Sequence, residues 1–336
     1  MSDADHRSTQ PVEPVQPLQP LAPAQVAGFA ERVLDEVARA VVGKREVLSL
    51  VLAGILAKGH VLLEDFPGLG KTLAARSFAG ALGLEFSRAQ FTPDLLPADL
   101  TGSYVYDQRR AEFDFRPGPV FAGLLLADEV NRTPPKTQAA LLEAMQERQV
   151  TVGGETHPLP DPFLVVATQN PIEYEGTYPL PEAQLDRFLF KVDVGYPGEE
   201  DERAMLRLPH RGVAPAGLDG IEAVARADEL LSARDEVDAI TIADEVAAYV
   251  TALVRKTREL PSVALGASPR AAVHLAAASR AAAWLAGRAF ATPDDVARMA
   301  LPVLRHRLIL RPEAELERYR ADDAVQAALQ AVPVPR

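Results

Sequence analysis

The chain has 336 residues, 48% of them hydrophobic, which is enough for two domains with buried cores. Its 35 basic and 47 acidic side chains give a formal charge of −12, which argues against sequence-nonspecific nucleic-acid binding, and the lack of cysteine excludes disulfides and thiolate metal sites. The sequence shows neither an apolar stretch long enough to cross a bilayer nor the pattern of a signal peptide, so we expect a cytoplasmic protein.

Residues 1–25 predict a disordered, proline-rich tail. Proline recurs at every third residue from Pro11 to Pro23, a period that suits polyproline II and does not suit a packed core. A docking peptide is the alternative interpretation of this segment.

Alternating helices and strands follow the tail. Helical periodicity begins at Phe29, Gly43 interrupts it, and a second helix is expected at 45–58. Further helices are expected at 71–82 and 136–147, among strands at 60–64, 85–90, 123–127, 163–168 and 188–194. This alternation predicts a mainly parallel sheet with helices on both faces. Two segments interrupt it and predict hairpins, at 102–117 and 149–160.

Helical periodicity dominates beyond Tyr196-Pro197-Gly198, at 227–237, 242–258, 271–287 and 293–305. The sequence therefore predicts a nucleotide-binding core at 26–197 and a smaller, all-helical domain at 198–336.

A phosphate-binding loop is predicted where the strand at 60–64 meets the helix at 71–82. Gly68 and Gly70 let backbone N–H groups approach an anion, Lys71 would reach the β- and γ-phosphates of ATP, and Thr72 would place a hydroxyl on Mg²⁺. Asp65 stands where the strict motif has glycine, and Asp tolerates left-handed backbone. The predicted nucleotide-binding residues here are Pro67, Gly68, Leu69, Gly70, Lys71 and Thr72.

Polar residues also end the next two apolar strands. Asp128 would hold Mg²⁺, and Glu129 would activate the attacking water, since buried acids need a cation or water. Asn170 follows the strand at 163–168 and would hydrogen-bond the γ-phosphate or that water. Together these residues predict an ATPase.

Two arginines complete the prediction. Arg187 lies between a short helix and the last strand, from where it would reach the nucleotide of a neighbouring subunit rather than its own. Arg270 follows Ser268, a plausible N-cap, and Pro269, which suits the first helical position, so it would be aimed at the phosphates. A surface salt bridge for Arg187 and a solvated position for Arg270 are the alternatives.

Taken in order, these motifs resemble AAA+ ATPases, and within them the MoxR family, over about residues 26–310. The resemblance is carried by 59–72, 90–102, 127–149, 167–171, 180–188, 266–270 and 292–296. It implies an α/β fold, namely a P-loop parallel αβα sandwich followed by a helical lid. It also implies a homo-oligomeric ring, usually a hexamer, with ATP at each subunit interface.

The resemblance also implies individual roles. Asn170 would be the first sensor, Arg187 a finger in trans and Arg270 the second sensor, while Val42 and Gly43 would line the adenine pocket. Residues 102–117 match the insertion that interrupts the second core helix in this branch.

MoxR-like proteins are thought to remodel or activate partner proteins, often with a von Willebrand factor A domain protein, and similar ATPases insert metal ions into enzymes. A chaperone-like ATPase is thus the leading hypothesis. A nucleic-acid motor is one alternative, because the first hairpin carries Arg109 and Arg110, although the net charge opposes it. An ATP-gated scaffold with little turnover is another, opposed by the presence of Glu129 and Arg187.

Overall fold

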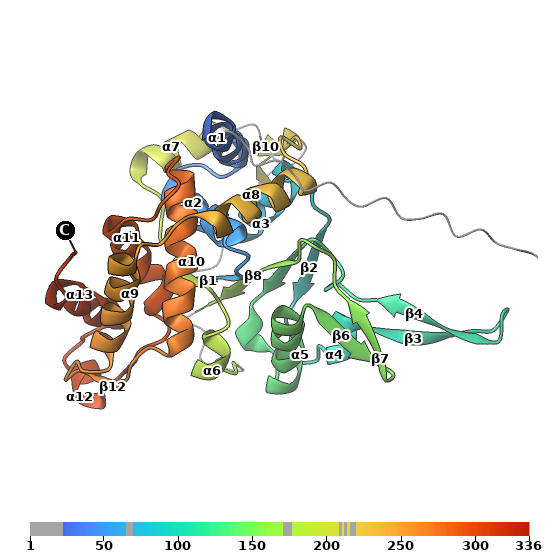
Figure 1. Cartoon of the computed structure of the whole chain (residues 1–336). Coiled ribbons are helices and arrows are strands. Elements are labelled where there is room, and N and C mark those ends of the chain that lie inside the picture. The colour runs from blue at the N-terminus through green and yellow to red at the C-terminus, as the bar shows by residue number, and fades with distance from the viewer. Residues whose placement is uncertain are drawn as a thin grey trace, which may run out of the picture.

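A five-stranded parallel sheet forms the centre of the protein (Figure 1). The computed structural model describes residues 23–64, 70–170, 177–207, 210–211, 214–215 and 220–335. The strand order is β2-β5-β8-β1-β9, with β1 at Val61–Glu64, β2 at Phe86–Gln90, β5 at Leu124–Asp128, β8 at Leu164–Gln169 and β9 at Phe190–Asp193. Every neighbouring pair is parallel, so all carboxyl ends share one edge of the sheet. The predicted parallel sheet is confirmed.

Helices cover both faces of the sheet, because its central strands are apolar on both sides. In β1, Val61 and Leu63 join one hydrophobic cluster and Leu62 joins the other. The first cluster contains α1 (Pro23–Ala40), α2 (Arg45–Leu56) and α3 (Lys71–Ala81). The second contains α4 (Pro97–Thr101) and α5 (Pro135–Glu147).

Helix α1 begins at Pro23, earlier than the helical periodicity indicated and inside the segment predicted to be a tail. Proline is compatible with the first turn of a helix, where its missing N–H would have no intrahelical acceptor. Residues 1–22 lie outside the described part of the chain.

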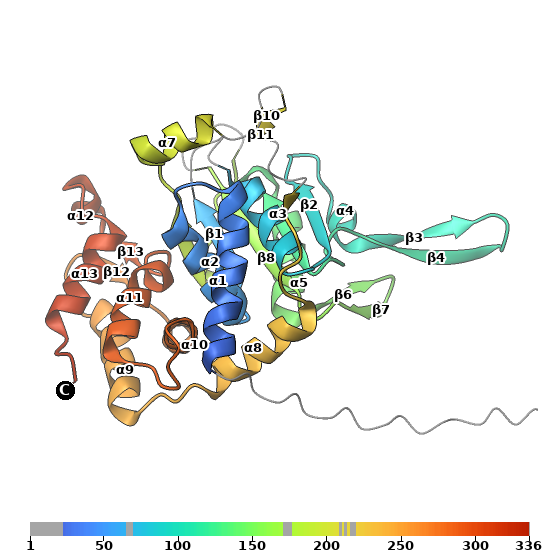
Figure 2. The same cartoon turned by 90° about the horizontal axis from the view of Figure 1, so that it is seen from above.

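Both predicted hairpins are present, and the longer one projects far from the sheet (Figure 2). It pairs β3 (Gly102–Asp107) with β4 (Glu112–Pro117), and the shorter one pairs β6 (Gln149–Val152) with β7 (Glu155–Pro158). Aromatic and polar contacts join them. The Phe115 ring stacks on His157 with centroids 3.9 Å apart, and Tyr104 Oη donates to Glu155 Oε2 at 2.6 Å.

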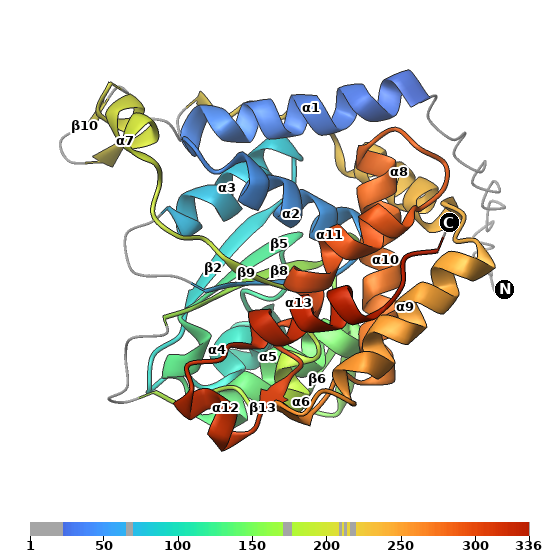
Figure 3. The same cartoon turned by 90° about the vertical axis from the view of Figure 1, so that its left-hand side faces the viewer.

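The carboxyl-terminal part is mainly helical, as predicted, and packs as a lid beside the sheet (Figure 3). Its helices are α8 (Ala227–Ala239), α9 (Asp244–Thr257), α10 (Pro269–Leu285), α11 (Pro293–Leu304), α12 (Pro312–Leu316) and α13 (Ala321–Ala331). In the chain, α6 (Glu182–Leu185) lies between β8 and β9, and α7 (Glu199–Leu206) follows β9. The lid shares the hydrophobic cluster of α1 and α2, where Phe29 meets Trp284 edge to face at 6.0 Å.

Two short antiparallel ladders were not predicted in this region. They pair β10 (His210–Arg211) with β11 (Ala214–Pro215), and β12 (Val263–Leu265) with β13 (Ile309–Leu310). Segments of two or three residues are too short to show the alternation by which strands are recognised.

Candidate functional site

The residues predicted to bind phosphate, where they are described, lie at the carboxyl edge of the sheet. Gly70 is the N-cap of α3 and has φ 84°, a left-handed conformation that favours glycine. Lys71 and Thr72 open α3, so their side chains stand at its N-terminus, the end of a helix that attracts anions. The predicted residues Pro67, Gly68 and Leu69 lie outside the described part of the chain.

Asp128 and Glu129 reach the same edge from β5, and a buried hydroxyl joins them. Thr168 Oγ1, on the adjacent β8, donates to Asp128 Oδ1 at 2.6 Å and accepts from the backbone N–H of Glu129 at 2.8 Å. Glu129 has φ 58°, uncommon for a residue with a side chain and a feature that clusters at functional sites. The two acids are therefore held in one fixed arrangement.

Each acid also has a partner from β2 that the sequence analysis missed. Arg88 Nη2 donates to Asp128 Oδ2 at 2.7 Å, and Gln90 Nε2 donates to Glu129 Oε2 at 2.7 Å. The missing information was the register: β2 pairs with β5 so that Gln90 lies opposite Asp128. Such long-range pairing leaves no local pattern in a sequence.

Asn170 follows β8 directly and is buried at 5% exposure. Its carbonyl oxygen accepts from Asn131 Nδ2 at 3.3 Å, which ties it to the turn after Glu129. The predicted sensing amide thus lies at the same edge as the two acids.

The turn at Val42 and Gly43 meets the segment after β9. A Cβ on Gly43 would lie 2.1 Å from Asp201 Cγ, and the φ of this glycine is 77°. Lys44 Nζ donates to the carbonyl oxygen of Gly195 at 2.7 Å. The turn predicted to line the adenine pocket therefore packs against 195–201, a contact that the sequence analysis did not predict.

Arg187 and Arg270 lie elsewhere, in a cavity of about 220 Å³ that they line together with His60, Met145, Gln146 and His274. His60 immediately precedes β1, and Arg187 lies shortly before β9, so this cavity is at the amino edge of the sheet. A strand of four residues separates the two edges by roughly 13 Å. The structure groups Arg270 with Arg187, and not with Lys71 and the acids.

The histidines of this cavity are uncharged near neutral pH. His60 Nδ1 accepts from the Val165 N–H at 3.0 Å and Nε2 lies 3.2 Å from the Met145 carbonyl, which fixes the neutral tautomer. Burial lowers the pKa of His60 to about 4. Burial, and then the Arg307 guanidinium, lower the pKa of His274 to about 4. The positive charge of the cavity therefore comes from its arginines.

Comparison with known proteins identifies the family of the chain. The "ATPase family associated with various cellular activities (AAA)" matches residues 60–190, and the AAA lid domain matches 255–328. The chain is 46% identical to Chaperone MoxR1 of Mycobacterium tuberculosis, over 91% of this chain and 82% of that protein. The chain belongs to the MoxR family of AAA+ ATPases.

Two further relatives of this MoxR-family chain match along nearly their whole length. YeaC of Bacillus subtilis is 48% identical over 90% of this chain and 94% of YeaC. A solved structure from Cytophaga hutchinsonii, provisionally named as an ATPase, superposes with a TM-score of 0.86 at 40% identity, covering 94% of this chain and 97% of that one. The expected AAA+ fold with a helical lid is confirmed. None of the helices in the described ranges is both long and apolar enough to cross a membrane.

Proposed function

We propose that this MoxR-family chain hydrolyses ATP with Mg²⁺ at sites completed by neighbouring copies in a ring, usually a hexamer. One observation carries the proposal: the acids lie at the carboxyl edge of the sheet, whereas Arg187 and Arg270 share a cavity at the amino edge. One copy therefore does not offer both sets to the same phosphate. In a head-to-tail ring, the amino edge of one copy would face the carboxyl edge of the next.

The carboxyl edge would hold the nucleotide. Lys71 would bind the phosphates, Val42 and Gly43 would contact the base, and Thr72 and Asp128 would hold Mg²⁺. Hydroxyl and carboxylate oxygens are the ligands that this cation prefers. Asp128 already pairs with the cationic side chain of Arg88, which supports its proposed role as a ligand of a cation. When bound, Mg²⁺ neutralises charge on the phosphates.

Glu129 would accept the proton of the attacking water. Its carboxylate contacts Gln90 at 2.7 Å and lies 3.3 Å from Arg132, so these neighbours orient it. Asn170, at the same edge of the sheet, would position the water or the γ-phosphate through its amide. Arg187 and Arg270 would bring two positive charges to the phosphates of the neighbouring copy.

Mixed rings test the shared site. A Lys71→Ala subunit lacks the phosphate contact but keeps its arginines, while an Arg187→Ala subunit keeps the phosphate contact and lacks its arginine. Each variant alone should be inactive, and their mixture should recover hydrolysis, because some interfaces then combine an intact site with an intact arginine. Absence of recovery in rings shown by double-affinity purification to be mixed would refute the shared site.

We extend the proposal to the work of the ring. Because a relative at 46% identity is named a chaperone, we propose that ATP turnover remodels or activates a partner protein in the cytoplasm. A von Willebrand factor A domain protein is the partner we propose, with metal insertion into an enzyme as one outcome. Addition of such a protein should raise the ATPase rate of the wild type, and no change with any such partner would count against this role.

A nucleic-acid motor is less well supported. The projecting hairpin carries Arg109, Arg110 and Arg116, but the acids Asp107, Glu112 and Asp114 balance them. A groove that tracks phosphates needs net positive charge. Salt-dependent binding of a fluorescent oligonucleotide would revive this alternative.

A further inference from the structure

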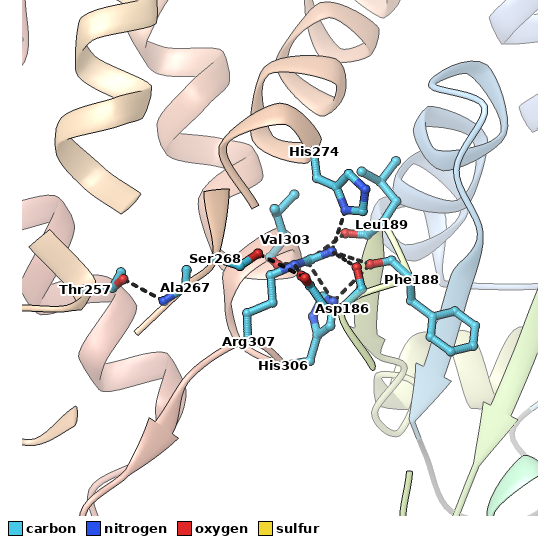
Figure 4. A network of polar contacts seen from close by, with 10 residues as sticks. All are labelled: Asp186, Phe188, Leu189, Thr257, Ala267, Ser268, His274, Val303, His306 and Arg307. Atoms are coloured by element: carbon cyan, nitrogen blue, oxygen red, sulfur yellow. Dashed lines mark hydrogen bonds and ion pairs between the residues drawn. The ribbon is translucent and has the colours of Figure 1, made fainter. Parts of the chain in front are cut away.

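A buried arginine of the lid, Arg307, forms hydrogen bonds with the segment that carries Arg187 (Figure 4). Its side chain is 1% exposed, and its Nε donates to Asp186 Oδ1 at 2.6 Å. The same guanidinium donates to the carbonyl oxygens of Phe188 at 2.5 Å and Leu189 at 3.3 Å. Arg307 thus binds the chain on both sides of Arg187.

The guanidinium of Arg307 also contacts the helix that carries Arg270. Its Nη2 donates to His274 Nδ1 at 2.5 Å, and His274 lies one turn after Arg270 on α10. Asp186 provides a second link, because its Oδ2 accepts from Ser268 Oγ at 2.9 Å, just before α10 begins. Arg307 and Asp186 therefore join the segments of both cavity arginines.

The turn before α10 is fixed from within the lid. The Ala267 N–H donates to Thr257 Oγ1 at 3.0 Å, and Thr257 Oγ1 donates to the Val254 carbonyl at 2.7 Å. Figure 4 shows the contact of Ala267 with Thr257 next to the contact of Ser268 with Asp186. The position of Arg270 is thereby tied to the lid on one side and to Asp186 on the other.

We infer that Arg307 and Asp186 are positioning residues that set the geometry of Arg187 and Arg270 for the neighbouring copy's ATP. This inference rests on the proposed function, in which the two arginines act in trans. A buried ion pair stabilises a fold no better than well-packed apolar side chains of similar volume. A hydrogen-bonded buried network, by contrast, selects one arrangement of the groups it joins. The planar, multidentate guanidinium serves several acceptors at once, which the single ammonium of lysine does not.

The test compares the same substitution in the two subunits that form a shared site. In the mixture of Lys71→Ala and Arg187→Ala subunits, the former donates the arginine and the latter offers the nucleotide site. Arg307→Lys is added either to the donating subunit or to the accepting one, and the recovered ATPase rate is measured. Differently tagged subunits and two affinity steps confirm that the rings are mixed.

We expect Arg307→Lys in the donating subunit to lower the recovered rate at least about tenfold, because displacement of a catalytic group by 1 Å costs on the order of 100-fold. In the accepting subunit the same change should alter the rate less than about twofold, since that subunit already lacks Arg187. Equal losses in both arrangements would assign a purely structural role and overturn the inference alone. No recovery in the parent mixture would overturn the proposed function, and the inference with it.

A second variant and a control distinguish a positioning role from a general loss of stability. Asp186→Asn keeps the size and one oxygen acceptor but removes the charge, and it should show the same donor-specific loss. Arg288→Lys is the matched control, because Arg288 donates to both carboxylate oxygens of Asp295 inside the lid, at 2.8 and 2.6 Å. It should lower thermal stability without any difference between the two arrangements, and a donor-specific loss here would contradict the inference.

Discussion

The two edges of the sheet are built in different ways. At the carboxyl edge, the side chains that hold Asp128 and Glu129 come from neighbouring strands of the core: Arg88, Gln90 and Thr168. At the amino edge, the cavity takes residues from the start of β1, from α5, from before β9 and from the lid. The first edge can thus keep its geometry within the core, whereas the second depends on where the lid sits.

The largest effect is expected at the amino edge. Arg187→Ala should lower ATPase turnover by about a thousandfold or more, the range found for arginine fingers, because the transition-state charge loses its guanidinium. ATP affinity of the isolated subunit, measured by titration calorimetry, should stay unchanged, since its own nucleotide lies at the other edge. Arg255→Ala, at an exposed lid position, serves as the control. Weakened ATP binding by Arg187→Ala subunits would place this arginine in its own site and remove the contrast between the edges.

A loss of turnover that stays within one subunit is expected at the carboxyl edge. Glu129→Gln should lower turnover by about 100-fold to 10,000-fold, because the general base is lost while the side chain keeps its shape and an acceptor for Gln90. ATP should still bind. In mixed rings the loss should follow the subunit that binds the nucleotide. Turnover equal to wild type would show that Glu129 is not the base.

A smaller effect is expected when the Thr168 hydroxyl between the two acids is removed. Thr168→Val keeps the size but leaves Asp128 Oδ1 without this donor and the Glu129 N–H without its acceptor. Unsatisfied buried groups cost about 1–3 kcal/mol each, so urea unfolding should show a loss of that order, and turnover should fall about tenfold. Thr156→Val, at an exposed hairpin position, should change neither. A stable Thr168→Val protein with full activity would show that the acids do not need this bridge.

The last effect is a pH dependence of stability at the amino edge, and it leaves turnover near neutral pH unchanged. Because burial lowers the pKa of His60 from 6.5 to about 4, the folded state binds fewer protons than the unfolded state between these values. Its contribution to stability is complete above pH 6.5 and is lost as the pH falls toward 4, by up to about 3 kcal/mol at 1.36 kcal/mol per unit. His60→Gln, which keeps a donor and an acceptor, should flatten this part of the urea-unfolding profile. An unchanged profile would mean that other groups dominate the acid response.

The site residues that adjoin a predicted strand or helix could be predicted from the sequence. The contacts that depend on strand order and on the packing of the lid could not. The loop residues Lys71 and Thr72, the strand-ending acids and Asn170 are contiguous with apolar runs that predict strands, so their common edge follows from parallel pairing. Arg88 and Gln90 depend on which strand is the neighbour of β5, and nothing in β2 itself indicates this. The start of the helix that carries Arg270 could be recognised from Ser268 and Pro269. The direction in which Arg270 points depends on how the lid packs, which the sequence does not show.

Helix α5 connects the two edges of the sheet. It starts just after the turn that follows Glu129, and its far end supplies Met145 and Gln146 to the arginine cavity before the chain enters the shorter hairpin. A helix of 13 residues is a stiff rod of about 20 Å. In the proposed ring, a shift at the acids would therefore reach the lining of the cavity that holds Arg187 and Arg270. It would also reach the shorter hairpin, because β6 begins two residues after α5 ends.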